Sequence, residues 1–183
     1  MINIDLYLSQ YLFQFGRDLP QLLVVFLAIG LTWVLFVFVL YRASRLAARQ
    51  DKIMFLARAA LAAALGLGLN ALIAYFYFRT RPFAAEGFAA LISKSALEKS
   101  FPSDHATVAW AVATVIFLYN KKSGYWAIIA ATLIGLGRVL AGVHYVGDVV
   151  AGAGLGILVA WLVFKISANA AGWIRGGRGA AGG

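Results

Sequence analysis

Residues 101–119 decide the fold and read Phe-Pro-Ser-Asp-His-Ala-Thr-Val-Ala-Trp-Ala-Val-Ala-Thr-Val-Ile-Phe-Leu-Tyr. After His105 this run carries no charged residue. Ser103 stands where a serine side chain typically caps the first turn of a helix. The pattern therefore predicts an apolar helix over residues 104–119, with its charged and histidine side chains gathered at the N-terminal end.

Apolar segments also precede and follow this stretch, most of them close to the roughly 20 residues needed to cross a bilayer. Of the 183 residues, 63% are hydrophobic and only 13% are charged. A water-soluble domain of this size could not bury that much apolar surface. We expect an all-α integral membrane bundle forming one domain over residues 1–167, with five transmembrane helices at about 20–41, 53–78, 104–119, 125–143 and 146–167.

The two ends of the chain differ from these spans. Residues 1–18 mix apolar and polar side chains and are too short and too polar to cross a bilayer. They predict an interfacial helix that ends near Gly16 and Pro20, and no signal peptide is expected. Residues 168–183 are rich in glycine and alanine, which predicts a flexible tail.

The net charge of +9 indicates membrane orientation and contact with anionic lipids, because no basic stripe supports nucleic-acid binding. Five-span alternation places residues 42–52, residues 120–124 and the tail on one side, and this side is the more basic. The positive-inside rule then puts it in the cytoplasm. The N-terminus, the 79–103 loop and the 144–148 turn are expected on the external side, so the polar motifs share one face.

A histidine and an aspartate follow one another at a spacing of four. If the fifth span begins near Tyr145, His144 and Asp148 lie one turn apart on the same helix face. A carboxylate bonded to one imidazole nitrogen fixes the tautomer and leaves the other nitrogen free for nucleophilic attack on phosphorus. A purely structural pair at the start of a helix would have the same spacing, so this pair alone does not distinguish a catalytic role from a structural one.

His105 lies in the expected first turn of the 104–119 helix. The free N–H groups at such a terminus bind anions, and the Ser103 hydroxyl could add a further donor. His105 would then stand beside a bound phosphate and could protonate a leaving oxygen. The alternatives are an interfacial histidine bonded to backbone and a serine that is only a cap.

Arginines supply the positive charge that a phosphoryl group in transfer requires, because planar guanidinium groups match its oxygens in two-point contacts. Arg81 ends the second span, directly before Pro82. Arg138 is surrounded by apolar residues, where facing lipid would cost at least ~2.5 kcal/mol. It should therefore face an internal anion or carboxylate, whereas Arg79 is also compatible with a place at the membrane surface.

A metal site is the competing chemistry. His105, His144 and Asp148 could in principle hold zinc, but the arginines would repel a cation. The chain has no cysteine, and its other acids are scattered. We expect no metal and no cofactor.

Three blocks follow in order on successive spans: Arg-Pro at 81–82, Pro-Ser-x-His at 102–105 and Arg-x5-His-x3-Asp at 138–148. Together they resemble the type 2 phosphatidic acid phosphatase superfamily of membrane lipid phosphatases. That resemblance implies a metal-independent phosphatase that works through a phosphohistidine. The implied roles are His144 as nucleophile, Asp148 as its partner, His105 as general acid, and Arg81, Ser103 and Arg138 as phosphate-binding residues.

Three positions depart from the family pattern, which is Lys-x6-Arg-Pro, Pro-Ser-Gly-His and Ser-Arg-x5-His-x3-Asp. The lysine falls on Ala74, and Arg79 is the nearby candidate to replace it. The glycine is Asp104, and the serine before the arginine is Gly137. A carboxylate beside a phosphate needs a cation, so we expect Asp104 and Arg79 to pair within the phosphate site.

Phe-Arg-x-Arg-Pro-Phe at 78–83 with Phe-Pro-Ser-Asp-His-Ala at 101–106 looks like the bacterial undecaprenyl-diphosphatase branch. This implies an external site in a bacterial plasma membrane, where the terminal phosphate of the carrier lipid is removed. Phosphatidic acid, phosphatidylglycerol phosphate and lipid A phosphates are alternative substrates. A non-catalytic lipid-binding or transport protein is the alternative of another class. Residues 83–101 link two blocks, either as a flap or as an inert loop.

Overall fold

The computed structural model describes residues 4–180, and the side chains of residues 4–168. Within this range the chain forms helices and no strand, which confirms the all-α prediction. The elements are α1 (Ile4–Asp18), α2 (Gln21–Val25), the π-helical η1 (Phe26–Gly30), α3 (Leu31–Ser44), α4 (Arg49–Phe76), α5 (Pro82–Ala85), α6 (Asp104–Tyr119), α7 (Lys121–Leu140) and α8 (Val146–Ala180).

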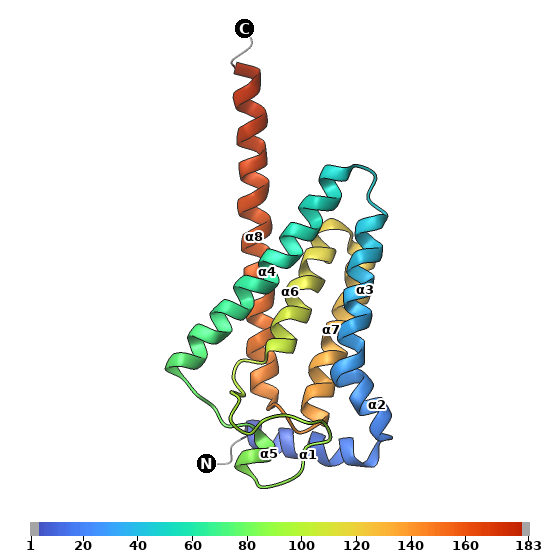
Figure 1. Cartoon of the computed structure of the whole chain (residues 1–183), viewed down its shortest axis with the longest axis vertical. Coiled ribbons are helices and arrows are strands. Elements are labelled where there is room, and N and C mark those ends of the chain that lie inside the picture. Colours follow the sequence, from blue (N-terminus) through green and yellow to red (C-terminus); the bar gives the residue numbers. More distant parts are fainter. Residues whose placement is uncertain (1–3, 181–183) are drawn as a thin grey trace.

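In the part of the chain that the structure describes, four helical segments are long and apolar enough to cross a membrane, namely Gln21–Ser44, Arg49–Phe76, Lys121–Leu140 and Val146–Ala168. The remaining predicted span, residues 104–119, is α6, which is apolar but has only 16 residues. It packs against α8, α7 and α4, so it occupies the middle of the bundle (Figure 1). The predicted membrane bundle is confirmed, with a short central helix.

The boundaries of the spans differ from the prediction by a few residues. α7 begins at Lys121 because the Asn120 side chain caps it, accepting from the Ser123 N–H at 2.9 Å. The expected 120–124 connection is thus a single residue. α7 ends at Leu140, and Gly142 then turns the chain with a φ of 75°.

α6 and α8 touch through glycine, which sets the position of the motifs. A Cβ at Gly156 would collide with the α6 backbone at Thr107, and a Cβ at Gly152 would collide with the Ser103 carbonyl. This close approach lets the Ser103 N–H donate to the Asp148 carbonyl at 3.1 Å. The first turns of the two helices are therefore side by side.

The terminal segments lie at opposite ends of the bundle. α1 runs across the end formed by α7 and the loops, as expected for an interfacial helix (Figure 1). α8 continues as a helix to Ala180. The flexibility expected of residues 168–183 stays a prediction, and residues 1–3 and 181–183 lie outside the described residues.

Candidate active site

All three sequence blocks meet at the end of the bundle covered by α1 (Figure 1). The segment between α4 and α6 folds back on itself there, with the Ser100 N–H donating to the Arg79 carbonyl at 2.8 Å. Several polar residues of this end, among them Arg81, His144 and Asp148, are buried, although no strand or disulfide holds them within the described chain. Helix termini and one folded loop thus position the site.

His144 lies between α7 and α8 and is almost fully buried. Its Nδ1 is 2.9 Å from the Ser100 carbonyl oxygen. A carbonyl only accepts hydrogen bonds, so Nδ1 must carry the hydrogen and Nε2 must carry the lone pair. Nε2 faces Arg81, whose Nη1 lies 3.3 Å away. The unprotonated nitrogen therefore points toward the guanidinium group of Arg81.

Burial is the main cause that lowers the pKa of His144, to about 4. The nearby Arg138 and Arg81 charges act in the same direction, whereas Asp148 opposes it. The imidazole is consequently neutral at physiological pH, which is the state that a nucleophile requires.

Asp148 belongs to the first turn of α8 and is fully buried. Its Oδ2 accepts from the Ser100 hydroxyl at 2.5 Å and from the Tyr145 N–H at 2.8 Å. The distance from Oδ2 to His144 Nδ1 is 3.6 Å, which is too long for a hydrogen bond and would suit an ion pair only with a protonated imidazole. The predicted direct bond is thus replaced by Ser100, whose carbonyl and hydroxyl hold both residues.

Arg81 directly precedes α5 and is buried. Its Nη1 donates to the Val143 carbonyl at 3.0 Å, and its Nη2 pairs with Glu98 at 3.1 Å. Its Nε is buried without a hydrogen-bond partner among the described residues. Since Glu98 is 46% exposed, that carboxylate can leave the Nε–Nη2 edge without breaking a buried contact.

Arg138, in the last turn of α7, is only 1% exposed. Its single acceptor among the described residues is the Ala28 carbonyl, 3.4 Å from Nη1. Both Nε and Nη2 are buried and unpaired within the described chain. A buried cation with no carboxylate partner is costly unless an anion binds to it, so this side chain is a candidate for binding an anion.

The first turn of α6 carries the Pro-Ser block. Ser103 is the N-cap, and its hydroxyl accepts from the Ala106 N–H at 3.5 Å, which confirms its predicted capping role. His105 is partly buried in the first turn of α6, and no described residue is hydrogen-bonded to its ring. Its imidazole is therefore available to a ligand.

Asp104 does not pair with Arg79, contrary to expectation. Its Oδ1 accepts from Lys99 Nζ at 2.6 Å and from Asn70 Nδ2 at 2.7 Å. Lys99 reaches it because the loop turns sharply before α6, where Nζ also donates to the Pro102 carbonyl at 2.7 Å. The cation beside Asp104 thus comes from the adjacent loop, and Arg79 has other partners.

Comparison with known proteins agrees with this arrangement of buried histidine, carboxylate and arginines. The sequence model of the PAP2 superfamily matches residues 55–171, which is more than half of the chain. The chain belongs to the PAP2 superfamily.

Relatives at the sequence level match only part of their length. The chain is 38% identical over 102 residues to undecaprenyl-diphosphatase BcrC of Bacillus subtilis (strain 168), covering 56% of this chain and 52% of that protein. It is 39% identical over 84 residues to a Bacillus licheniformis protein named bacitracin transport permease protein BcrC, covering 46% of this chain and 41% of that protein. The match thus spans about half the length of these relatives.

A solved structure supports the PAP2 fold. The transmembrane PAP2-type phosphatidylglycerolphosphate phosphatase from Bacillus subtilis superposes with a TM-score of 0.68 at 27% sequence identity. The superposition covers 90% of this chain and 85% of that chain. The helical arrangement is therefore that of PAP2 membrane proteins.

Arg79 occupies a place that PAP2 sequence blocks alone do not indicate. Its Nη2 pairs with Asp5 of α1 at 2.7 Å and its Nη1 pairs with Asp148 at 2.8 Å. Its guanidinium carbon lies 3.7 Å from the Tyr145 ring centroid. Burial acts to lower the pKa of Arg79, but these two carboxylates outweigh it and raise the pKa. Its predicted contact with a phosphate stays a prediction.

Four contributors to this PAP2 site carried no signal in the sequence: Asp5, Glu98, Lys99 and Ser100. Each lies in an interfacial helix or in the 83–101 loop, where no periodic pattern or motif fixes a direction. That loop is anchored over the site, because Ile92 packs in the core beside Val143 and the Leu91 N–H donates to the Ala141 carbonyl at 3.0 Å.

Proposed function

We propose that this protein is a membrane phosphatase that removes the terminal phosphate of undecaprenyl diphosphate through a phosphohistidine intermediate. One observation carries the proposal. The unpaired Nε and Nη2 of the buried Arg138 lie at the same end of the bundle as the Nε2 lone pair of His144 and the unpaired Nε of Arg81. Two guanidinium groups and a neutral imidazole suit an anionic phosphoryl group.

In the first step, Nε2 of His144 forms a bond to the terminal phosphorus while the bond from phosphorus to the bridging oxygen breaks. Ser100 keeps the hydrogen on Nδ1, and the nearby Asp148 carboxylate stabilises the positive charge that the ring acquires. His105 gives its proton to the departing oxygen of the lipid phosphate. The Nε–Nη2 edge of each arginine binds phosphoryl oxygens, with Glu98 displaced from Arg81.

In the second step, water attacks the phosphohistidine. His105, now neutral, takes a proton from that water, and the bond from phosphorus to Nε2 of His144 breaks to release inorganic phosphate. Arg81, Arg138, Ser103 and the helix N-terminus stabilise the negative charge in both transition states. Because these groups supply the positive charge, the proposed reaction needs no metal ion.

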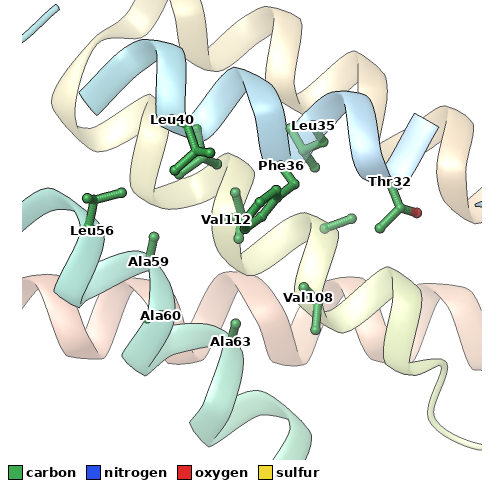
Figure 2. Close-up of a pocket in the computed structure, with 12 residues that line it drawn as sticks. Thr32, Leu35, Phe36, Leu40, Leu56, Ala59, Ala60, Ala63, Val108 and Val112 are labelled. Carbon is green, nitrogen blue, oxygen red and sulfur yellow. The ribbon is translucent and has the colours of Figure 1, made fainter. Parts of the chain in front are cut away.

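A groove beside the site supports a substrate with a long apolar tail. A cavity of about 380 Å³ lies between α3, α4 and α6 (Figure 2). On α6 it is lined by Val108, Ala109 and Val112, which lie three, four and seven residues after His105 and hence on the same helix face. A lipid whose phosphate reaches His105 can therefore lay its tail along α6 into this groove.

The basic residues support an external site. At the end opposite the site, the C-terminal end of α3, the start of α4, a residue between them and the start of α7 carry six cations (Figure 1). The positive-inside rule places that end in the cytoplasm, together with the C-terminal end of α8. We infer that the site faces the external side of a bacterial plasma membrane. The six cations are Arg42, Arg45, Arg49, Lys52, Lys121 and Lys122.

Two other candidate functions have specific support. Phosphatidylglycerol phosphate is favoured by the superposition on the Bacillus subtilis phosphatase. A transport role is suggested by the name of the Bacillus licheniformis relative. The first keeps the same chemistry with another lipid, whereas the second requires no phosphate release.

The test is phosphate release by detergent-purified protein in EDTA, with undecaprenyl diphosphate, phosphatidic acid and phosphatidylglycerol phosphate as substrates and His144→Ala as control. We expect preference for the prenyl diphosphate. Preference for a glycerolipid would replace the substrate and keep the mechanism. Release only after added divalent metal would overturn metal independence, and no release by folded protein would overturn the enzyme function.

A further inference from the structure

α1 lies outside the PAP2 match, which begins at residue 55, yet it contacts the catalytic end directly. Asp5 Oδ1 accepts from the Gly147 N–H at 2.8 Å, and Ser9 Oγ accepts from the Val146 N–H at 2.9 Å. These N–H groups belong to the first turn of α8, where no earlier helical carbonyl can accept from them. α1 therefore caps the helix that carries Asp148.

Asp5 does more than cap. Its second oxygen, Oδ2, accepts from Arg79 Nη2 at 2.7 Å, and Arg79 Nη1 donates to Asp148 Oδ1 at 2.8 Å. Asp148 in turn lies beside Nδ1 of His144. The ring of Tyr145 stacks on the guanidinium of Arg79. Four ionisable groups, from Asp5 through Arg79 and Asp148 to His144, thus form one continuous chain.

We propose that Asp5 is a positioning residue for the nucleophile, acting through Arg79 on Asp148. Arg79 has a carboxylate on each side, and Asp5 balances its positive charge. Arg79 can therefore hold Asp148 in place while the negative charge of Asp148 still acts on the His144 ring. Without Asp5, the only carboxylate paired with Arg79 among the described residues would be that of Asp148. The positive charge of Arg79 would then offset the negative charge of Asp148, which would stabilise the developing imidazolium less well. This inference rests on the proposed histidine nucleophile and adds one residue of α1, Asp5, to those that position it.

The capping contact and the contact with Arg79 can be separated chemically. A helix cap needs one acceptor oxygen, and asparagine provides it as well as aspartate. Only a carboxylate also accepts from a guanidinium at its second oxygen. Asp5→Asn should therefore keep the cap on Gly147 and lose the contact with Arg79.

The experiment compares kcat and KM for the prenyl diphosphate in Asp5→Asn, Ser9→Ala and Asp18→Asn. Ser9→Ala removes the neighbouring cap, and Asp18→Asn removes a charge from an exposed site on the same helix. We expect Asp5→Asn to lower kcat by about 10- to 100-fold, with KM within about twofold of wild type. Ser9→Ala and Asp18→Asn should keep the wild-type kcat.

Arg79→Gln and the double variant test the route. If Asp5 acts through Arg79, the double variant should be no slower than Arg79→Gln alone, since effects within one network are not additive. If the loss of kcat in the double variant instead equals the product of the two single losses, the proposed route through Arg79 would be overturned. An equal loss of kcat in Ser9→Ala and Asp5→Asn would reduce Asp5 to an anchor for α1 and overturn the proposal.

A second readout does not need activity. The chain has two histidines, so the imidazole ¹⁵N resonances can be assigned with His105→Ala. We expect Asp5→Asn to shift the His144 resonances and their titration, and Ser9→Ala to leave them unchanged. Unchanged resonances in Asp5→Asn would overturn the inference. An inactive wild type with a shifted His144 would overturn only the proposed function.

Discussion

The two sides of the His144 ring are built on opposite principles. On the Nδ1 side, Ser100, Asp148, Arg79 and Asp5 match donors with acceptors at 2.5–2.9 Å. On the Nε2 side, guanidinium donors exceed acceptors, and three buried nitrogens of Arg81 and Arg138 have no partner in the described chain. One side is complete in the free protein, whereas the other requires an anion.

The arginine pKa values follow the same division. The pKa of Arg79, on the Nδ1 side, is raised because two carboxylates outweigh its burial. The pKa of Arg81, on the Nε2 side, is lowered because burial outweighs the charge of Glu98. We call the Nδ1 side the back of the site and the Nε2 side its front. The back is preorganised, whereas the front is electrostatically unfavourable until an anion binds, and substrate binding can use this difference for catalysis. Variants of the two sides should therefore differ in their effects on stability and activity.

The largest effect is expected where the two sides meet. His144→Ala removes the proposed nucleophile and should lower phosphate release on the order of 10⁴-fold or more. Single-turnover release of phosphate from purified protein measures this loss. Activity above a tenth of the wild-type rate would rule out His144 as nucleophile.

Arg138→Met tests the front. We expect kcat/KM to fall about 10²- to 10³-fold, while the melting temperature rises, because an apolar side chain of similar size removes a buried unpaired charge. Activity assays and thermal melts in the same detergent check both directions. Arg138→Lys is the control, since it keeps the charge and loses the planar fork. A lower melting temperature in Arg138→Met would mean that Arg138 stabilises the fold.

The pH dependence of stability comes next. The pKa of His144 is about 4 in the folded protein and about 6.5 in an unfolded chain. Between these values the unfolded state binds the extra proton, so stability should fall as the pH drops from 6.5 to 4, by up to about 3 kcal/mol. Melts of wild type and His144→Asn across this range isolate the contribution. The same change of stability with pH in both proteins would contradict this contribution of His144.

Arg79→Gln probes the back and should have the smallest effect on stability. Asp148 and Asp5 would lose their shared cation, and we expect a loss of about 2 kcal/mol, because the pair with Asp5 is partly exposed. Stability is again measured by melts, with Arg17→Gln at an exposed position of α1 as control. If Arg79 instead binds the second phosphate, diphosphate cleavage would fall more than monophosphate cleavage.

Most of the front, on the Nε2 side, could be predicted from the sequence, because Arg81, Ser103 and Arg138 belong to motifs with local geometry. Glu98, which pairs with Arg81, carried no such signal. In the back, on the Nδ1 side, Asp148 could be predicted from its spacing to His144, but Asp5 and Ser100 could not. Asp5 is 142 residues from Gly147, to which it binds, and only the folding of α1 across the bundle brings them together. Ser100 has the same explanation, since its two contacts depend on the path of the loop.

The short α6 has a consequence for how deep the reaction occurs. Sixteen residues give about 24 Å of helix, against about 30 Å of hydrocarbon. If its far end reaches the opposite interface, its N-terminus stops several ångströms below the headgroups. A lipid held there keeps its tail at its normal depth while its phosphate is drawn slightly inward. Because α6 is shorter than the hydrocarbon layer, the substrate could reach the site without leaving its leaflet.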